Sequence, residues 1–90
     1  MREDIDIVRE AVALHLEVDV HGIHAEQNLR RDLGLTALAL VLIALDLEDI
    51  ETLSIPFEPL NDVDTVADLA QLVSQSRANA VRAHFMVSPH

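Results

Sequence analysis

The sequence of 90 residues contains no cysteine, tryptophan or tyrosine, and Phe57 and Phe85 are its two aromatic residues. Because there is no cysteine, the chain has neither a disulfide nor thiol chemistry, and the redox compartment is not constrained. Half of the residues are hydrophobic all the same. These features predict one small domain with an aliphatic core of Leu, Ile, Val and Ala and a small margin of stability.

Positive charge is also scarce, since lysine is absent and six Arg stand against 16 acidic residues, for a net charge of −10. The segment from Asp32 to Ser76 contains acids but no Arg. Such a surface repels phosphate backbones, which argues against a nucleic-acid partner. It would steer basic proteins toward the chain, although a surplus of acid also serves solubility alone.

No apolar run is long enough to cross a membrane. The apolar run over residues 37–45 falls well short of the roughly 20 residues that a spanning helix needs. The N-terminus, Met1–Asp4, is acidic and lacks the apolar core of a signal peptide. We therefore expect a cytoplasmic protein without a membrane partner.

Apolar residues at helical spacing predict three main helices within a single domain that covers residues 1–90. We expect the first helix over about 4–16 and the second over about 37–53, ended by Pro56. Residues 57–62 can form a short helical turn. Thr65 and Asp68 resemble a capping box that opens a final helix, and residues 77–90 are expected to extend it as a helix or tail.

A long loop, residues 18–35, separates the first two helices. A loop of this length needs apolar anchors to stay ordered. Val20, Ile23, Leu29 and Leu33 are the candidates, and Gly34 is expected to make the turn into the second helix.

The second helix carries two apolar stripes on different sides. We assign the first stripe to the core: Leu40, Ile43, Leu47 and Ile50. The second stripe follows the i, i+3, i+4, i+7 pattern: Leu38, Val41, Leu42 and Leu45. This second stripe either packs under the long loop or the C-terminal tail, or remains exposed as a surface for protein association.

The residues that open the second helix resemble a known motif. Residues 32–38 read Asp-Leu-Gly-Leu-Thr-Ala-Leu, similar to the Asp-Leu-Gly-x-Asp-Ser-Leu motif of the acyl carrier protein family. Further segments match the family in the same ungapped alignment: Leu47-Glu48, Ile55-Pro56 and Val63-Asp64-Thr65-Val66. The resemblance covers nearly the whole chain. It implies an all-α, four-helix acyl-carrier fold of three main helices and a short one.

The family serine, which carries phosphopantetheine, corresponds to Ala37 in this chain. A methyl group has no oxygen for a phosphodiester bond, so no cofactor is expected on the chain as written. Thr36, one residue earlier, is a conceivable substitute attachment site. Because a Thr hydroxyl can accept a bond from an orphan backbone N–H, we interpret Thr36 as the N-cap of the helix.

In the family, the second face of this helix meets the partner enzymes and is flanked by acids. The resemblance therefore places partner binding on six residues: Leu38, Val41, Leu42, Leu45, Asp46 and Asp49. It implies partners such as synthases or acyltransferases of lipid or polyketide biosynthesis that have basic docking surfaces. Ala39 and Leu42 stand where the family commonly has acids.

No other pattern indicates a chemical site. His21 and His24 lie close in sequence but lack a third ligand, which argues for two surface histidines rather than a metal site. The serines lack the Gly-x-Ser-x-Gly context of a nucleophile, and there is no glycine-rich phosphate loop. We expect no metal and no catalytic residue, so the protein is not expected to be an enzyme.

Three hypotheses follow from the sequence. The chain is a family member that has lost the attachment serine and acts by binding or scaffolding partners. Alternatively, it is an ordinary carrier of fatty-acid or polyketide type in which the serine has been substituted. The third hypothesis is a self-associating structural module that buries the stripe Leu38, Val41, Leu42 and Leu45 in a homodimer.

Overall fold

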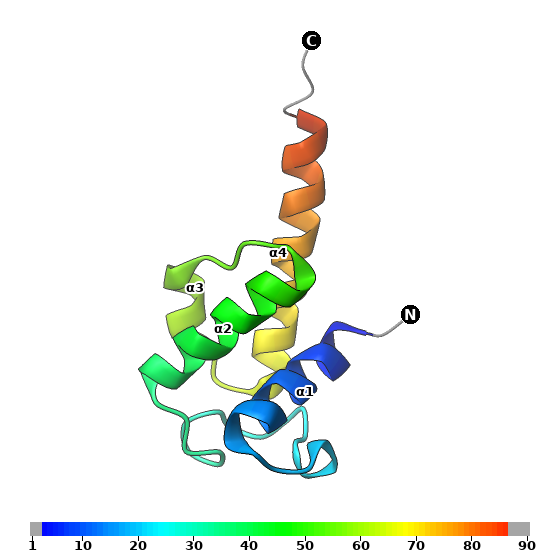
Figure 1. Ribbon diagram of the computed structural model, residues 1–90. Helices are drawn as coiled ribbons and strands as arrows, with labels where there is room; N and C mark the ends of the chain where they lie inside the picture. The colour runs from blue at the N-terminus through cyan, green and yellow to red at the C-terminus, as the bar shows by residue number, and fades with distance from the viewer. Residues whose placement is uncertain (1–2, 87–90) are drawn as a thin grey trace.

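The computed structural model describes residues 3–86 of the chain and shows a helical bundle (Figure 1). Its elements are α1 (Asp4–Leu16), α2 (Ala37–Glu51), α3 (Phe57–Asn61) and α4 (Val66–Met86), with a short 3-10 turn, η1 (Val20–Gly22), in the first loop. No strand occurs within residues 3–86. The predicted four-helix, all-α fold is thereby confirmed.

The core lies where α1 packs against both α4 and α2. Val8 and Val12 of α1 are fully buried and meet Leu69 and Val73 of α4 in one aliphatic cluster. Phe57 is 60% exposed and lies outside this cluster. The expectation of an aliphatic core is therefore confirmed for the described residues.

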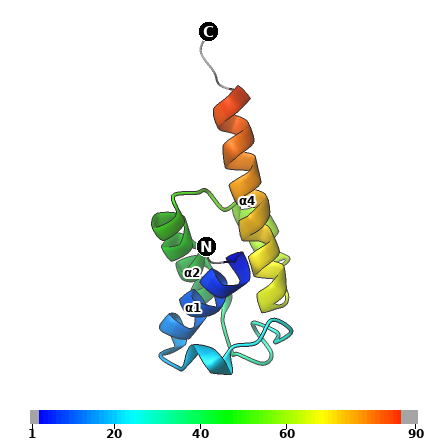
Figure 2. The same cartoon turned by 90° about the vertical axis from the view of Figure 1, so that its right-hand side faces the viewer.

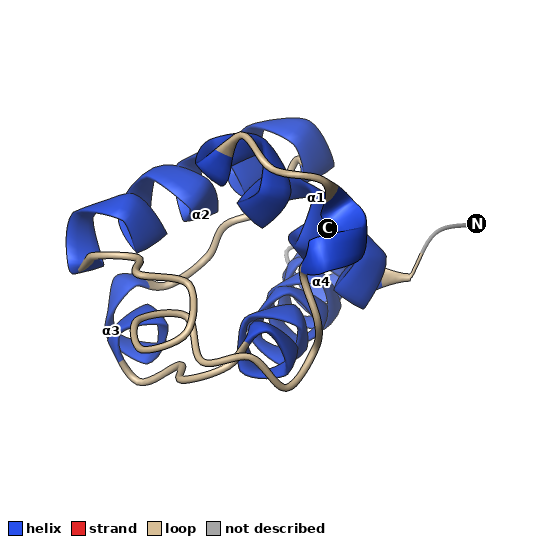
Figure 3. Ribbon diagram, turned by 90° about the horizontal axis from the view of Figure 1, so that it is seen from below, coloured by secondary structure: helices blue, strands red, loops and turns tan. Residues whose placement is uncertain are grey.

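The long first loop is held by the anchors that the sequence predicts. Ile23 and Leu29 are buried, whereas Val20 and Leu33 pack against the core while partly exposed. Leu29 N–H donates to the Asp64 carbonyl at 2.8 Å, which fixes the loop against the start of α4. Figure 3 shows the loop passing beneath the helices to reach α2.

Arg9 of α1 ties the beginning of the same loop to the bundle. Its Nε donates to the Ile23 carbonyl at 2.6 Å and its Nη2 to the Val20 carbonyl at 3.0 Å. These two bonds satisfy the Ile23 carbonyl and add to the Val20 carbonyl, which also accepts from the Ile23 N–H at 3.0 Å. Side chains thus help to order the segment between α1 and α2, together with the turn η1 and the backbone bond of Leu29 to Asp64.

The second helix ends earlier than predicted, at Glu51 rather than near residue 53. Thr52 takes a left-handed conformation, φ 53°, which terminates the helix. Ile50 was expected in the core but is 64% exposed, so this assignment is wrong. The reason is geometric: Glu51, at i+11 and i+7 from Leu40 and Ala44, continues the buried line of the helix instead.

The last helix begins with the predicted capping box. Thr65 Oγ1 accepts from the Asp68 N–H, and Asp68 Oδ2 accepts from the Thr65 N–H, both at 3.1 Å. The helix then continues to Met86, and its C-terminal part projects beyond the other helices (Figure 2). The expected extension is therefore helical over residues 77–86, and residues 87–90 lie outside the described part.

Candidate functional site

The turn before α2 is closed by its own hydrogen bonds. Asn28 Oδ1 accepts from the N–H groups of Arg30 and Arg31, at 3.0 and 2.7 Å. Gly34 N–H donates to the Arg30 carbonyl at 3.1 Å, and Gly34 itself has a φ of +69°, as the predicted turn requires. This closed turn fixes the direction in which α2 begins.

Thr36 and Ala37 lie at the exposed start of α2. Thr36 Oγ1 accepts from the Ala39 N–H at 3.1 Å, which confirms the predicted N-cap. Ala37 is the first residue of the helix, and its side chain faces solvent. The nearest side-chain oxygen in sequence is therefore the capping hydroxyl of Thr36.

The second apolar stripe of α2 is largely on the surface. Leu38, Leu42 and Leu45 are 68, 44 and 53% exposed, while Val41 is half-buried against the core. At about 100° per residue, the three leucines and Asp49 project along one side of the helix. The expected packing under the long loop is therefore wrong for the three leucines, while the end of the C-terminal tail, residues 87–90, lies outside the described residues.

The two ends of this surface differ in charge. Arg30 and Arg31 are exposed in the turn that precedes α2, whereas Asp46 and Asp49 are exposed near its C-terminus. Glu48 points the other way, since its carboxylate accepts from the Ile55 N–H at 2.6 Å. We call this surface the α2 face: Leu38, Leu42 and Leu45, with Arg30 and Arg31 at one end and Asp46 and Asp49 at the other.

A shallow apolar hollow of about 400 Å³ lies between α1 and α2. Leu14, Val18 and Ile50 border it, and all three are large apolar side chains exposed to solvent. This hollow was not predicted, because Ile50 was assigned to the core. The sequence contains a clue to this exposure. Ile50 and Glu51 are adjacent at the end of the helix, and only one of them can face the core there.

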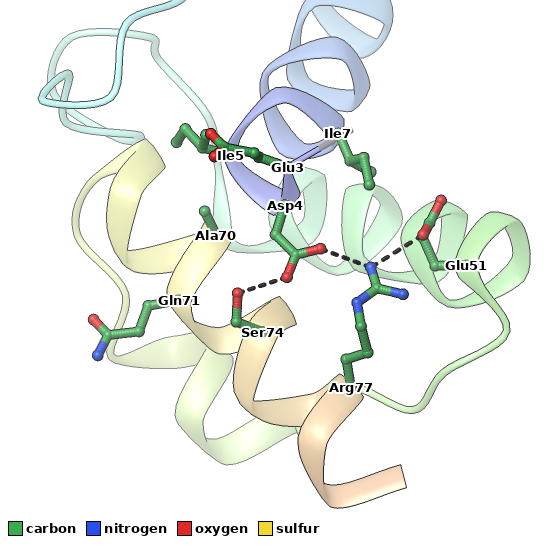
Figure 4. A pocket seen from close by; sticks show the side chains of 9 residues that line it. All are labelled: Glu3, Asp4, Ile5, Ile7, Glu51, Ala70, Gln71, Ser74 and Arg77. Carbon is green, nitrogen blue, oxygen red and sulfur yellow. Dashed lines mark hydrogen bonds and ion pairs between the residues drawn. The ribbon is translucent and has the colours of Figure 1, made fainter. Parts of the chain in front are cut away.

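A larger, open hollow of about 950 Å³ adjoins an ion-pair cluster between α1, α2 and α4 (Figure 4). Arg77 Nη2 lies 2.7 Å from Asp4 Oδ1 and 3.0 Å from Glu51 Oε1. Ser74 Oγ donates to Asp4 Oδ2 at 2.6 Å. The polar groups of Asp4, Glu51, Ser74 and Arg77 thus bind one another beside this hollow.

The charges of this cluster change the acidity of its members. Partial burial of the Asp4 carboxyl favours its neutral form, but the bonds from Ser74 and Arg77 and the charge of Arg77 outweigh that effect and lower the pKa of Asp4. The pKa of Arg77 is raised, chiefly by its bond to Asp4. Both groups are therefore charged at neutral pH.

This cluster was not predicted from the sequence. A signal was nevertheless present. Arg77 falls at i+4 from Val73 and i+7 from Ala70, on the buried line of α4, as Glu51 falls on the buried line of α2. Arg77 and Glu51 have opposite charges and both face inward on their helices, which predicts an ion pair between them.

Among the side chains that the structure describes, no three His, Asp or Glu residues gather in a way that could hold a metal ion. His21 instead pairs with Asp19 in the first loop, its Nδ1 2.8 Å from Asp19 Oδ1. None of the described helices has the length and apolar character to cross a membrane.

Comparisons with known proteins agree with one another in the family that they indicate. The family described as phosphopantetheine attachment site matches residues 6–73. Acyl carrier protein 3 of Ralstonia nicotianae is 36% identical over 75 residues, which are 83% of this chain and 86% of that protein. A probable acyl carrier protein of Caulobacter vibrioides is 40% identical over 58 residues, 64% of this chain and 67% of its own length.

The fold has a similar solved counterpart. A protein assigned as an acyl carrier protein from Mycobacterium tuberculosis superposes with a TM-score of 0.72 at 30% identity, over 79% of this chain and 95% of that one. The family match ends at residue 73, whereas α4 continues to Met86. The projecting end of α4 therefore lies beyond the matched region.

Proposed function

Because the chain belongs to the acyl carrier protein family, we propose that it is a member that does not carry phosphopantetheine and that acts by binding protein partners through the α2 face. The observation that supports this proposal most strongly is Ala37 at the exposed start of α2. Family members are carriers rather than enzymes, and they work by contact with enzymes such as synthases and acyltransferases. A binding role would retain the family's contact with partner enzymes without the cofactor.

The residues at the start of α2 do not fit phosphopantetheine. Attachment needs a side-chain oxygen at the helix start, and the exposed side chain of Ala37 is a methyl group. Thr36 Oγ1 is turned toward the helix, where it accepts from the Ala39 N–H. We therefore propose neither residue as an attachment site, and we assign no catalytic residue.

The α2 face supports partner binding by its composition. Three exposed leucines on one side of a helix make an apolar surface of the kind that marks association sites. Asp46 and Asp49 lie beside them and would pair with basic side chains of a partner. Val41 contributes less to this surface than the other residues of its stripe, since it is half-buried.

The test is incubation with a promiscuous phosphopantetheinyl transferase and coenzyme A, followed by intact-mass measurement. We expect the mass of the chain to remain unchanged. The matched control is the Ala37→Ser variant, which differs by one oxygen and should gain the mass of one phosphopantetheine. Modification of the parent chain overturns the proposal, and peptide mapping to Thr36 would show that the cap hydroxyl is reactive.

A further inference from the structure

The α2 face is asymmetric along its length. The apolar part, Leu38, Leu42 and Leu45, has two exposed arginines at its N-terminal end and two exposed aspartates at its C-terminal end. None of these four charged side chains makes an ion pair or hydrogen bond within the described part of the chain, and only backbone groups of Arg30 and Arg31 are bonded. Their charges are therefore free to act on a partner.

The placement of the two arginines at one end is fixed by the backbone. Gly34 N–H is bonded to the Arg30 carbonyl, and Leu35 N–H to the Leu29 carbonyl at 2.9 Å. The turn therefore folds back, so that Arg30 lies beside Gly34 and Leu35, directly before the first turn of α2. The positive charge precedes the apolar residues and cannot move to the other end of the helix.

The acids at the other end oppose the dipole of their own helix. Helix C-termini favour cations, but the last turn of α2 has no basic residue and the first turn has no acidic one. Each end of α2 would thus be relieved by the opposite end of a second, antiparallel α2. The charge pattern is self-complementary under a two-fold rotation.

We infer that the α2 face binds a second copy of this chain, with the two α2 helices antiparallel, so that Arg30 and Arg31 of each copy meet Asp46 and Asp49 of the other across the three leucines. This inference rests on the proposed use of the α2 face for association. In this arrangement Leu38 faces the second copy's Leu45. Leu42 lies next to the two-fold axis, midway between them.

The size of the face sets the strength of this dimer. A helix of 15 residues is roughly 22 Å long, so one helix pair buries less than the roughly 1,000 Å² expected of a stable interface. The net charge of −10 on each copy also opposes association. We therefore expect a weak dimer, with a dissociation constant of roughly 10 μM to 1 mM.

The decisive experiment mixes two charge-reversed variants and uses sedimentation velocity at about 0.15 M salt, where distant charges are screened beyond roughly 8 Å. One variant carries Arg30→Glu and Arg31→Glu, which changes the net charge from −10 to −14, and the other carries Asp46→Arg and Asp49→Arg, which changes it to −6. In a homodimer of either variant, side chains of the same charge would face each other across the interface. We expect each variant alone to dimerise at least tenfold more weakly than the parent.

An equal mixture of the two variants should restore association to within a few-fold of the parent. Since both variants keep a negative net charge, gross attraction between oppositely charged molecules does not explain such a recovery. Circular dichroism must first show that both variants fold. Absence of recovery in the mixture, or a parent that stays monomeric up to about 1 mM, overturns the inference.

Two substitutions test the apolar part by the same measurement. Leu42→Glu places a charge at the two-fold axis and should abolish the dimer. Its matched control is Leu14→Glu, the same change at a leucine of α1 that is 74% exposed, which should leave the dimer unchanged. Equal effects of the two variants contradict the assignment of the interface to α2.

Cross-linking gives an independent readout, because the natural chain has no cysteine. Under mild oxidation Leu42→Cys should form a disulfide-linked dimer, whereas Gln75→Cys, exposed on α4, should not. Equal cross-linking of both variants contradicts the inference. The transferase experiment is separate: modification of a dimeric parent would refute the proposed lack of cofactor and leave the dimer intact.

Discussion

Arg77 of α4 lies 2.7 Å from the carboxylate of Asp4, 73 residues earlier in the chain. The same guanidinium nitrogen also reaches Glu51 at the end of α2, so one side chain connects three helices (Figure 4). Arg77 is also the point beyond which α4 projects from the bundle, since residues 78–80 are exposed. The cluster therefore fixes the last turn of α4 that contacts the body of the protein.

Loss of the Arg77 charge should destabilise the fold. In Arg77→Met the aliphatic stem is kept, but Asp4 and Glu51 face each other without a cation. Because the cluster is only partly buried, we expect a loss of about 1–2 kcal/mol in the free energy of unfolding. Urea denaturation measures it, with Arg30→Met as the exposed control. An unchanged midpoint in Arg77→Met would show that the cluster contributes no stability.

The contribution of Asp4 should depend on pH in one direction. Its pKa is lower in the folded than in the unfolded chain, whose reference value is 3.8, so its contribution to stability is fully present above that value. It is lost as the pH falls below 3.8 and through the folded pKa. The stability difference between the parent and Asp4→Asn should thus be constant from pH 5 to 7 and shrink below about pH 4. A difference that grows on acidification contradicts this assignment.

The buried and exposed lines of α2 should differ sharply in their response to truncation. Leu47 has no exposed surface, and Leu47→Ala should cost about 2–5 kcal/mol through lost burial and a cavity. Leu45→Ala makes the same chemical change two residues away, where the side chain is 53% exposed, and should cost less than about 1 kcal/mol. Denaturation at low protein concentration, where the chain is monomeric, measures both. Similar costs for the two variants would mean that the helix is rotated relative to the core.

Restoring the attachment serine should allow modification, but at a lower rate than in an ordinary carrier. Ala37→Ser supplies the hydroxyl, but Thr36 stands where the family motif has an acid, and Ala39 and Leu42 leave the adjoining surface uncharged. Adding Thr36→Asp should increase the rate, while the Asp side chain keeps the N-cap. The measurement is the rate of mass gain with transferase and coenzyme A. If the single variant already reacts as fast as an ordinary carrier, these neighbouring positions do not govern recognition.

Local patterns in the sequence were sufficient for the bounds of α1 and for the starts of α2 and α4, but not for the end of α2. The bounds of α1 and the capping box of Thr65 and Asp68 follow from spacing within one turn of helix, which tertiary packing did not override. The turn at Gly34 and the N-cap at Thr36 were predictable for the same reason, because each depends on a few neighbouring residues. The lack of a side-chain oxygen at Ala37 is likewise a property of the sequence.

The tertiary structure decided the burial of those apolar residues for which periodicity was misleading or left two possibilities. Ile50 fitted the core stripe of α2 by periodicity, but the inward position at the end of that helix is occupied by Glu51, since Arg77 arrives there from α4. The exposure of Leu38, Leu42 and Leu45 likewise depended on the paths of the loop and of α4, neither of which covers them. Periodicity defines the faces of a single helix, whereas the partner of each face comes from residues far apart in sequence, and it is their packing that determines burial.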